Sequence, residues 1–498
     1  MTVSGRRGAI GAWIAAGSAA LCLLTAGGSM TTTDAVVAFD LTQSLVHRHS
    51  IATSGDLIGN QAYRGVDGRY YSPFGIAQSV WNIPFYAAGR LIAARIKRPD
   101  TAAAIPKAIV TLGTIPAVAL LAWCAFALLV SLDAPLAASA ATATAVVFAT
   151  PLWPYSGFGF NQPLAGLFLW TSVLLAAGAR GHAARAALAG LALGAAVLTR
   201  QEMLLAAPFL LAYLWSMRGS LAHAAAFAAG LAPPAIAWGW YNWVRFGSPL
   251  ESGYLRDQVV GWGASPLAGA AGLLFSSYAS LFLYCPIALL SVAGLAAMWR
   301  RQRAAALLFI SIFAALFVLY ASVGNWMAGR AYGPRYLVPL LPALVLPLAW
   351  WRPASRRAWT AAAALVALSV AVQLPGVLVD YAKVRVSLAR QGETVAQDMR
   401  WSRAPLLLNA RAAAQVAPPA LAALVGLRPI ARVAPGGRLD DALADGPDLW
   451  WNSLLRLGVI GRGTALAIAA SLLAAAMLAF ARALRLAADG ERLSESRA

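Results

Sequence analysis

The sequence predicts an all-α, polytopic integral membrane protein with about twelve transmembrane helices. Of its 498 residues, 60% are hydrophobic and only 12% are charged, whereas soluble domains carry about 25% charged residues. The apolar residues form runs long enough to cross a bilayer, which takes about 20 residues per helix. Short arginine clusters separate these runs, as in membrane proteins whose cytoplasmic loops are basic.

The net charge of +20 does not indicate a nucleic-acid-binding protein. Such a protein gathers its basic residues on one wettable face, whereas here they are scattered between apolar runs. Cys22, Cys124 and Cys285 lie inside apolar runs and give neither a disulfide framework nor metal-ligand spacing. We therefore expect the lipid bilayer as a partner, no nucleic acid, no metal site and no cofactor.

The first apolar run, residues 8–28, follows Arg6 and Arg7 and predicts a retained transmembrane helix. A cleaved signal peptide is the alternative, but its apolar region is usually about 7–15 residues long. Further apolar runs predict the remaining helices: 105–131, 134–151, 163–179, 184–199, 203–217, 221–244, 280–299, 304–322, 336–350, 358–376 and 462–481.

Arginine placement predicts the orientation of these helices. With the N-terminus inside, nearly every short inside turn carries arginine, for example Arg218, Arg300 and Arg357. Both chain ends are then cytoplasmic, and two long segments, 29–104 and 377–461, fall outside. Residues 1–376 are expected to form the transmembrane core, and 462–498 the last helix and a cytoplasmic tail.

The first outer segment opens with two candidate catalytic acids. Thr31 followed by Asp34 is a capping-box pattern before a helix, so Asp34 would then only complement the helix dipole. Its functional alternative is a general base that takes a proton from an acceptor hydroxyl. Asp40 is about 120° away around a regular helix and is not expected to share the same pocket. We rank Asp34 first and Asp40 second.

Candidate substrate-binding residues follow in the same segment. Arg69, Tyr70 and Tyr71 come after an Asp-Gly turn signal. Guanidinium suits phosphate, while aromatic rings suit sugar faces or the membrane interface. An interfacial aromatic belt is the alternative for these residues. Residues 76–97 predict an amphipathic helix lying along the interface.

Four segments in chain order resemble the GT-C membrane glycosyltransferases, the group of protein mannosyltransferase-like and aminoarabinose-transferase-like enzymes. They are the first acid with DGRYYSPFG and QSVWNIPFYAAGRL, then ALGAAVLTRQEMLL, then FGSPLESGY with GLLFSSYASLFLYCPIALL, and finally NWMAGRAYGPRYLVPLLP. The similarity covers roughly residues 8–376. It departs from the family form at FSSYASL (275–281), where a glycine is expected, and at Ala35, where a paired-acid metal site would need an acid.

The resemblance implies a GT-C-like catalytic core within residues 1–376. Such an enzyme takes a sugar from a polyprenyl-phosphate carrier and passes it to an acceptor outside the cytoplasmic (inner) membrane. By the resemblance the base falls on Asp34, with Asp40 as the fallback. The sugar and the acceptor, which is a protein, a lipid or a polysaccharide, stay open.

Two further groups are candidates for binding the donor. Arg200 and Glu202 are ionisable residues near apolar depth at an outer helix end, a position that usually marks function; mutual pairing and snorkelling is the alternative. Arg330, Tyr332 and Arg335 lie at another outer helix end. Two arginines there can cradle a phosphate, with interfacial anchoring as the alternative.

The aromatic residues of the 152–162 loop, among them Tyr155 and Phe160, are interpreted mainly as an interfacial belt. Other functions also remain open: a transporter or flippase of lipid-linked saccharide, a non-catalytic scaffold of the same fold, or a ligase or polymerase. A transporter binds its substrate near mid-span on broken helices, whereas the candidate residues here gather at one outer rim.

Overall fold

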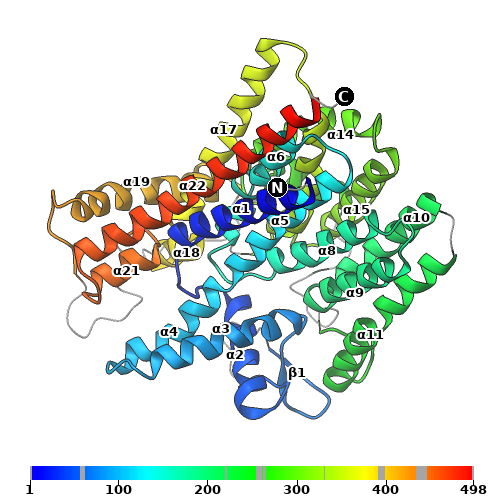
Figure 1. Cartoon of the computed structure of the whole chain (residues 1–498). Helices are drawn as coiled ribbons and strands as arrows, with labels where there is room; N and C mark the ends of the chain where they lie inside the picture. The colour runs from blue at the N-terminus through cyan, green and yellow to red at the C-terminus, as the bar shows by residue number, and fades with distance from the viewer. Residues whose placement is uncertain are drawn as a thin grey trace.

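The computed structural model describes residues 3–55, 62–218, 221–253, 261, 265–329, 331–390, 399–432 and 446–495. In these residues the regular secondary structure is helical, apart from one antiparallel hairpin in which Tyr63 pairs with Tyr71 (Figure 1). The predicted all-α class is confirmed.

Helices form throughout the predicted apolar runs. The bundle contains α1 (Val3–Thr25), α4 (Pro99–Leu112), α5 (Thr114–Ser131), α6 (Leu136–Phe148), α8 (Gln162–Ala177), α9 (Ala183–Thr199), α10 (Ala207–Arg218), α11 (Leu221–Phe246), α14 (Ser291–Trp299), α15 (Arg303–Ala321), α16 (Leu341–Val345), α17 (Arg356–Leu378) and α22 (Arg462–Glu495). Short helical turns join some of them: η2 (Gln201–Ala206), η3 (Pro286–Leu290), η4 (Arg335–Leu340) and η5 (Leu346–Trp350).

Smaller elements lie between and around these helices. They are α2 (Thr33–Gln43), η1 (Ser44–Arg48), β1 (Tyr63–Arg64), β2 (Tyr70–Tyr71), α3 (Ala77–Ala93), α7 (Leu152–Tyr155), α12 (Pro266–Phe275), α13 (Leu281–Tyr284), α18 (Tyr381–Arg390), η6 (Trp401–Arg403), α19 (Pro405–Leu424) and α21 (Trp450–Arg456). The predicted amphipathic helix at 76–97 corresponds to α3, which packs on α2 and α4.

Among the described residues, six helical stretches are long and apolar enough to cross a membrane, so the chain is a multi-pass membrane protein. The predicted number of about twelve spans is not confirmed. Several predicted runs form shorter helices, and the run at 336–350 is divided into η4, α16 and η5. Pro339, Pro342 and Pro347 interrupt that run because proline lacks the amide donor that a continuous helix needs.

Close backbone packing joins α9 to α11. A Cβ atom on Gly190 would lie 2.0 Å from the carbonyl oxygen of Phe227, and one on Gly230 would lie 1.8 Å from that of Ala187. Small residues at these positions let two helices approach closely in a lipid environment, where packing drives helix association. The two glycines thereby fix where the ends of α9 and α11 lie relative to each other.

The long polar segments gather at one end of the bundle, which we call the loop end. The amide of Asp448 donates to the carbonyl oxygen of Leu378 (2.7 Å), and that of Trp450 donates to Ala26 (2.9 Å). These bonds bring the segment before α21 to the ends of α1 and α17. Figure 1 shows α1 and α22 side by side, with α2, α3 and β1 in the lower part of the molecule.

At the opposite end, which we call the arginine end, contacts join the turn around Gln302 and the segments near both chain ends to the short turn between α5 and α6. Gln302 donates to the carbonyl oxygen of Leu132 (3.0 Å), and Glu491 accepts from the amide of Ala137 (2.9 Å). A Cβ atom on Gly490 would lie 3.4 Å from the side chain of Arg6. The arginine-bearing segments joined here therefore lie away from the contacts of the long polar segments, and the side of the membrane that each end faces stays a prediction.

Candidate functional site at the loop end

Asp34 forms an ion pair with Arg335, 301 residues away in the sequence. Asp34 lies in the first turn of α2, and Arg335 is the first residue of η4. The two side chains are only 13% and 12% exposed. The Arg335 guanidinium also lies 4.6 Å from the centre of the Phe160 ring, a distance typical of a cation–π contact.

The capping pattern at the start of α2 differs from the predicted one. Thr32 is the N-cap, and its hydroxyl accepts from the amide of Ala35 at 3.3 Å. Thr31, which the capping-box pattern makes the cap, instead donates its hydroxyl to Asp380. A tertiary contact with a distant segment moves the helix start by one residue, which the local pattern cannot reveal.

Arg200 and Glu202 form a second ion pair, with Arg200 Nε 2.7 Å from Glu202 Oε1. The mutual pairing that we considered as an alternative is therefore present. Arg200 has extended backbone between α9 and η2, and this break turns both side chains inward. Arg200 Nη1 also donates to Asn161 (3.1 Å), and the Tyr320 hydroxyl donates to Glu202 (3.0 Å).

Neutral side chains join the two ion pairs. With its amide oxygen turned toward the arginines, Gln162 accepts from Arg335 Nε and from Arg200 Nη1, both at 2.9 Å. The Tyr336 ring lies between them, 5.6 Å from the Arg200 guanidinium and 5.9 Å from that of Arg335. We call Asp34, Arg200, Glu202 and Arg335 the ion cluster. Its two guanidinium and two carboxylate groups are assembled from three separate parts of the chain.

A small polar pocket adjoins the ion cluster on the side of α11, with room for about one water molecule. Its lining includes Asn161, Arg200, Glu202, Trp238 and Arg245. Amide, guanidinium, carboxylate and indole groups thus meet in one place. A larger ligand would require these side chains to move.

Arg245 is a site-adjacent residue that sequence reasoning missed. It is 1% exposed and lies 3.7 Å from the centre of the Tyr241 ring. It donates to Asn242 Oδ1 (2.6 Å) and to the carbonyl oxygen of Ser72. Arg245 thereby attaches the end of α11 to the first loop. Its position directly after an apolar run is the signal that could have identified it.

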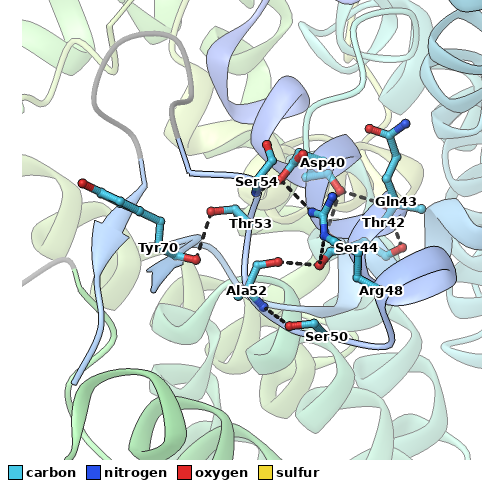
Figure 2. Close-up of polar contacts among 12 residues, drawn as sticks. Asp40, Thr42, Gln43, Ser44, Arg48, Ser50, Ala52, Thr53, Ser54 and Tyr70 are labelled. Carbon is cyan, nitrogen blue, oxygen red and sulfur yellow. Dashed lines mark hydrogen bonds and ion pairs between the residues drawn. The ribbon is translucent and has the colours of Figure 1, made fainter. Parts of the chain in front are cut away.

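Asp40 lies outside the ion cluster and stabilises a loop (Figure 2). It is 8% exposed, accepts from the amide of Ser54 at 2.8 Å and lies 3.6 Å from Arg48. Arg48 also donates to Ser44 (3.1 Å), whose hydroxyl donates to the carbonyl oxygen of Ala52. Asp34 and Asp40 have different partners, in keeping with their expected separation around the helix.

Arg69, Tyr70 and Tyr71 belong to the hairpin region, and their contacts do not include the ion cluster among the residues that the structure describes. Arg69 is 61% exposed and pairs with Asp67 at 2.6 Å, and the buried Tyr71 donates to Asp67 at 2.7 Å. Desolvation raises the pKa of Asp67, but the bonds from Tyr71 and Arg69 outweigh it and lower that pKa to about 2. Tyr70 is 44% exposed.

Tyr332 is a buried packing residue near the cluster. Its hydroxyl donates to the carbonyl oxygen of Val372 (2.5 Å), and its ring packs edge-on against Tyr284. Tyr155 and Phe160, interpreted as interfacial, are only 1% and 4% exposed and belong to the protein core. Arg330 lies outside the described residues.

Metal-ligating side chains do not form a group of three anywhere in the described part of the chain. The ion cluster itself can act through hydrogen bonds, ion pairs and proton transfer. Two guanidinium groups held by oxygen acceptors can exchange those acceptors for phosphate oxygens. A carboxylate beside them can accept a proton.

Comparison with known proteins gives no matching family model and no matching curated protein. Similar solved structures include two of the same protein. One is ArnT from Cupriavidus metallidurans in the apo state, with 14% identity, a TM-score of 0.46, and coverage of 96% of this chain and 75% of that chain. The other is ArnT from Cupriavidus metallidurans bound to undecaprenyl phosphate, with 15% identity, a TM-score of 0.43, and coverage of 97% and 76%.

Proposed function

We propose that this protein is a membrane glycosyltransferase that moves a sugar from a polyprenyl-phosphate carrier to an acceptor hydroxyl on the extracytoplasmic face of the inner membrane. The observation that carries the proposal is the ion cluster. Its carboxylates and guanidinium groups meet at the end of an apolar bundle, largely buried. A polyprenyl tail stays in lipid, so its phosphate has to be bound where helices end and loops begin.

Phosphate binding falls to Arg200 and Arg335 in this proposal. Both are guanidinium groups, which bind phosphate in a bidentate manner. Gln162 and Tyr336 lie against both of them and hold them side by side. Glu202, itself bonded by Tyr320, keeps the Arg200 side chain at the cluster.

Asp34 is the proposed general base. The acceptor oxygen attacks the anomeric carbon of the sugar, and a new glycosidic C–O bond forms. The bond between that carbon and the carrier phosphate breaks, and the phosphate oxygen leaves with the electron pair. Asp34 takes the proton from the acceptor hydroxyl. Guanidinium groups stabilise the charge that develops on the leaving phosphate.

Donor binding is expected to release the Asp34 carboxylate from its ion pair. Without ligand, an Asp34 oxygen is occupied by Arg335. A phosphate that recruits the Arg335 guanidinium competes with this bond and frees the carboxylate for the acceptor. Asp40 keeps its loop-stabilising contacts throughout and has no part in the proton transfer.

Purified protein incubated with a panel of polyprenyl-phosphate sugars and a cell-envelope extract as the source of acceptor hydroxyls tests the proposal, with release of polyprenyl phosphate as the readout. We expect release with at least one donor, loss of release in Asp34→Asn, and retention in Asp40→Asn. The same protein in proteoliposomes tests the transporter alternative. Movement of labelled donor across the bilayer without release of polyprenyl phosphate would indicate a transporter. If no donor gives either release or movement, the remaining interpretation is a non-catalytic scaffold.

A further inference from the structure

The start of α21 and the residues before it contact the end of α1 and the connection between α1 and α2. The indole nitrogens of Trp450 and Trp451 donate to the carbonyl oxygens of Leu23 and Leu24, both at 2.8 Å. The carbonyl oxygen of Asp448 would lie 3.1 Å from a Cβ atom on Gly27. Residues near position 450 therefore hold the connection between α1 and Asp34 in a defined path.

Asp380 lies at the centre of this contact, between α17 and α18. It is 3% exposed, and its backbone amide donates to Asp448 Oδ2 at 2.6 Å. One of its carboxylate oxygens accepts from the amide of Ala382 at 2.9 Å, and the other accepts from the Thr31 hydroxyl. Asp448 is also paired with Lys383. Asp380 thus reaches from the C-terminal segment to the residue three positions before Asp34.

A buried carboxylate is costly, and packing alone would be served by an apolar residue. Burial raises the pKa of Asp380, with the nearby Asp448 adding to the effect and Lys383 opposing it. An apolar residue at this position could pack equally well, but it could not accept the hydrogen bond from Thr31. Thr32 caps α2 immediately afterwards, so an anchor on Thr31 fixes the first helical turn, in which Asp34 lies.

We propose that Asp380 is a positioning residue, which holds Thr31 and thereby fixes the helical turn from which the Asp34 carboxylate projects. The inference rests on the proposed function for its kinetic consequence, but its structural part is independent of any activity. Asp34 is then held at two points, through its side chain by Arg335 and through its backbone by Asp380. The segment around Asp380 and Asp448 therefore helps to orient Asp34.

Kinetics of the full-length protein test the catalytic part. A base displaced by about 1 Å costs on the order of 10²-fold in rate, while phosphate binding by the arginines is unaffected. Asp380→Ala and Thr31→Val are therefore expected to lower kcat by about ten- to a hundredfold with little change in the donor KM. The double variant is expected to be no slower than either single variant. Asp380→Asn keeps an acceptor and a donor and is expected to restore most of kcat.

Hydrogen exchange tests the structural part without any substrate. The amides of Ala35 and Val36 bond to Thr32 in the first turn of α2, and a loosened Thr31 should expose them. We expect both variants to lower the protection of the 31–43 segment at least tenfold, a fold-change that local opening can produce. Ser277→Ala is the matched control, because it removes another buried bond to the C-terminal segment, from Ser277 to the carbonyl oxygen of Met399 (2.6 Å). It is expected to leave both kcat and this protection unchanged.

The outcomes separate the two proposals. One outcome is that the variants lower the hydrogen-exchange protection of the 31–43 segment in a protein that shows no transfer with any donor. That result would support the anchoring of Thr31 by Asp380 and reject the proposed transferase function. Wild-type protection or wild-type kcat in Thr31→Val would overturn the positioning role. Equal losses in Ser277→Ala would also overturn it, because the effect would then be a general loosening of the C-terminal segment.

Discussion

Replacement of Asp34 by Asn separates two contributions of one carboxylate. The ion pair with Arg335 stabilises the fold, and the proposed proton transfer accelerates the reaction. Breaking a buried ion pair costs about 3–5 kcal/mol. Both side chains keep 12–13% exposure, and Arg335 retains Gln162 and the carbonyl oxygen of Ala328 (3.4 Å). We therefore expect a smaller loss of about 2–3 kcal/mol in unfolding free energy.

The rate is expected to fall further than stability explains. Asn cannot accept a proton, so loss of the base should lower transfer by about 10²–10⁴-fold. Arg335→Gln should cost a similar amount of stability, because it leaves the Asp34 carboxylate without its ion-pair partner. In Asp34→Asn/Arg335→Gln both charges are gone, so the combined loss should be smaller than the sum by about 1–3 kcal/mol.

Unfolding in mixed micelles gives the stabilities, and release of polyprenyl phosphate by correctly folded protein gives the rates. The double variant should lose less stability than the sum of the two single losses, and it should stay inactive. Activity in the double variant would mean that Asp34 is a structural partner of Arg335 and not a base. Additive stability losses would instead show that the two side chains are not paired.

Further predictions concern other residues. Arg200→Lys and Arg335→Lys should each weaken donor binding several-fold, measured by titration with polyprenyl phosphate, since lysine keeps the charge but not the bidentate geometry; the exposed Arg428→Lys should not, and equal affinity in all three would reduce the cluster arginines to anchors. An impermeant thiol reagent on intact cells should label Ser54→Cys and miss Arg301→Cys, with the three native cysteines buried; the reverse pattern would invert the topology. Asp40→Ala should cost about 1–3 kcal/mol of unfolding free energy by leaving the Ser54 amide unsatisfied, whereas Asp40→Asn should turn over within a few-fold of wild type; an inactive Asp40→Asn would transfer the base to Asp40. The raised pKa of Asp380, which Thr31, Lys383 and Asp448 face, makes its contribution to stability greatest below the ordinary value of 3.8 and lost as pH rises through the raised value; the stability of wild type relative to Asp380→Asn should therefore fall from pH 4 upward, and a rise would contradict the burial of this carboxylate.

Helices could be predicted because an apolar run and its boundaries are local properties. Their lengths could not, since proline positions and turns shorten or divide them. The run at 336–350 shows this: its hydrophobicity indicates one span, but Pro339, Pro342 and Pro347 divide it into three short elements. The orientation inferred from the arginine turns stays a prediction, because it concerns the side of the membrane that each end of the bundle faces.

Four members of the candidate site, the ion cluster, could also be picked out from the sequence. Asp34, Arg200, Glu202 and Arg335 stood out because ionisable residues at helix ends are unusual in an apolar chain. Their partners did not stand out, since Asp34 and Arg335 are 301 residues apart. Gln162 is neutral, so no charge pattern draws attention to it. Asp380 could not be identified from the sequence, because an isolated acid in a polar segment is expected to be exposed to solvent. Only the folded chain shows that it is buried.

The segment around Trp450 packs on the end of α1, and this contact has a consequence for biosynthesis. The ribosome delivers α1 and Asp34 to the membrane long before Trp450, which bonds to Leu23 from 427 residues further along the chain. Through most of translation, the connection between α1 and α2 therefore lacks the indole and carboxylate partners that later secure it. A nascent chain arrested before position 446 would insert its apolar helices and still present this connection, together with Asp34, to quality-control proteases. Arrival of the segment around Trp450 is thus the step at which a correctly inserted chain becomes a protected one.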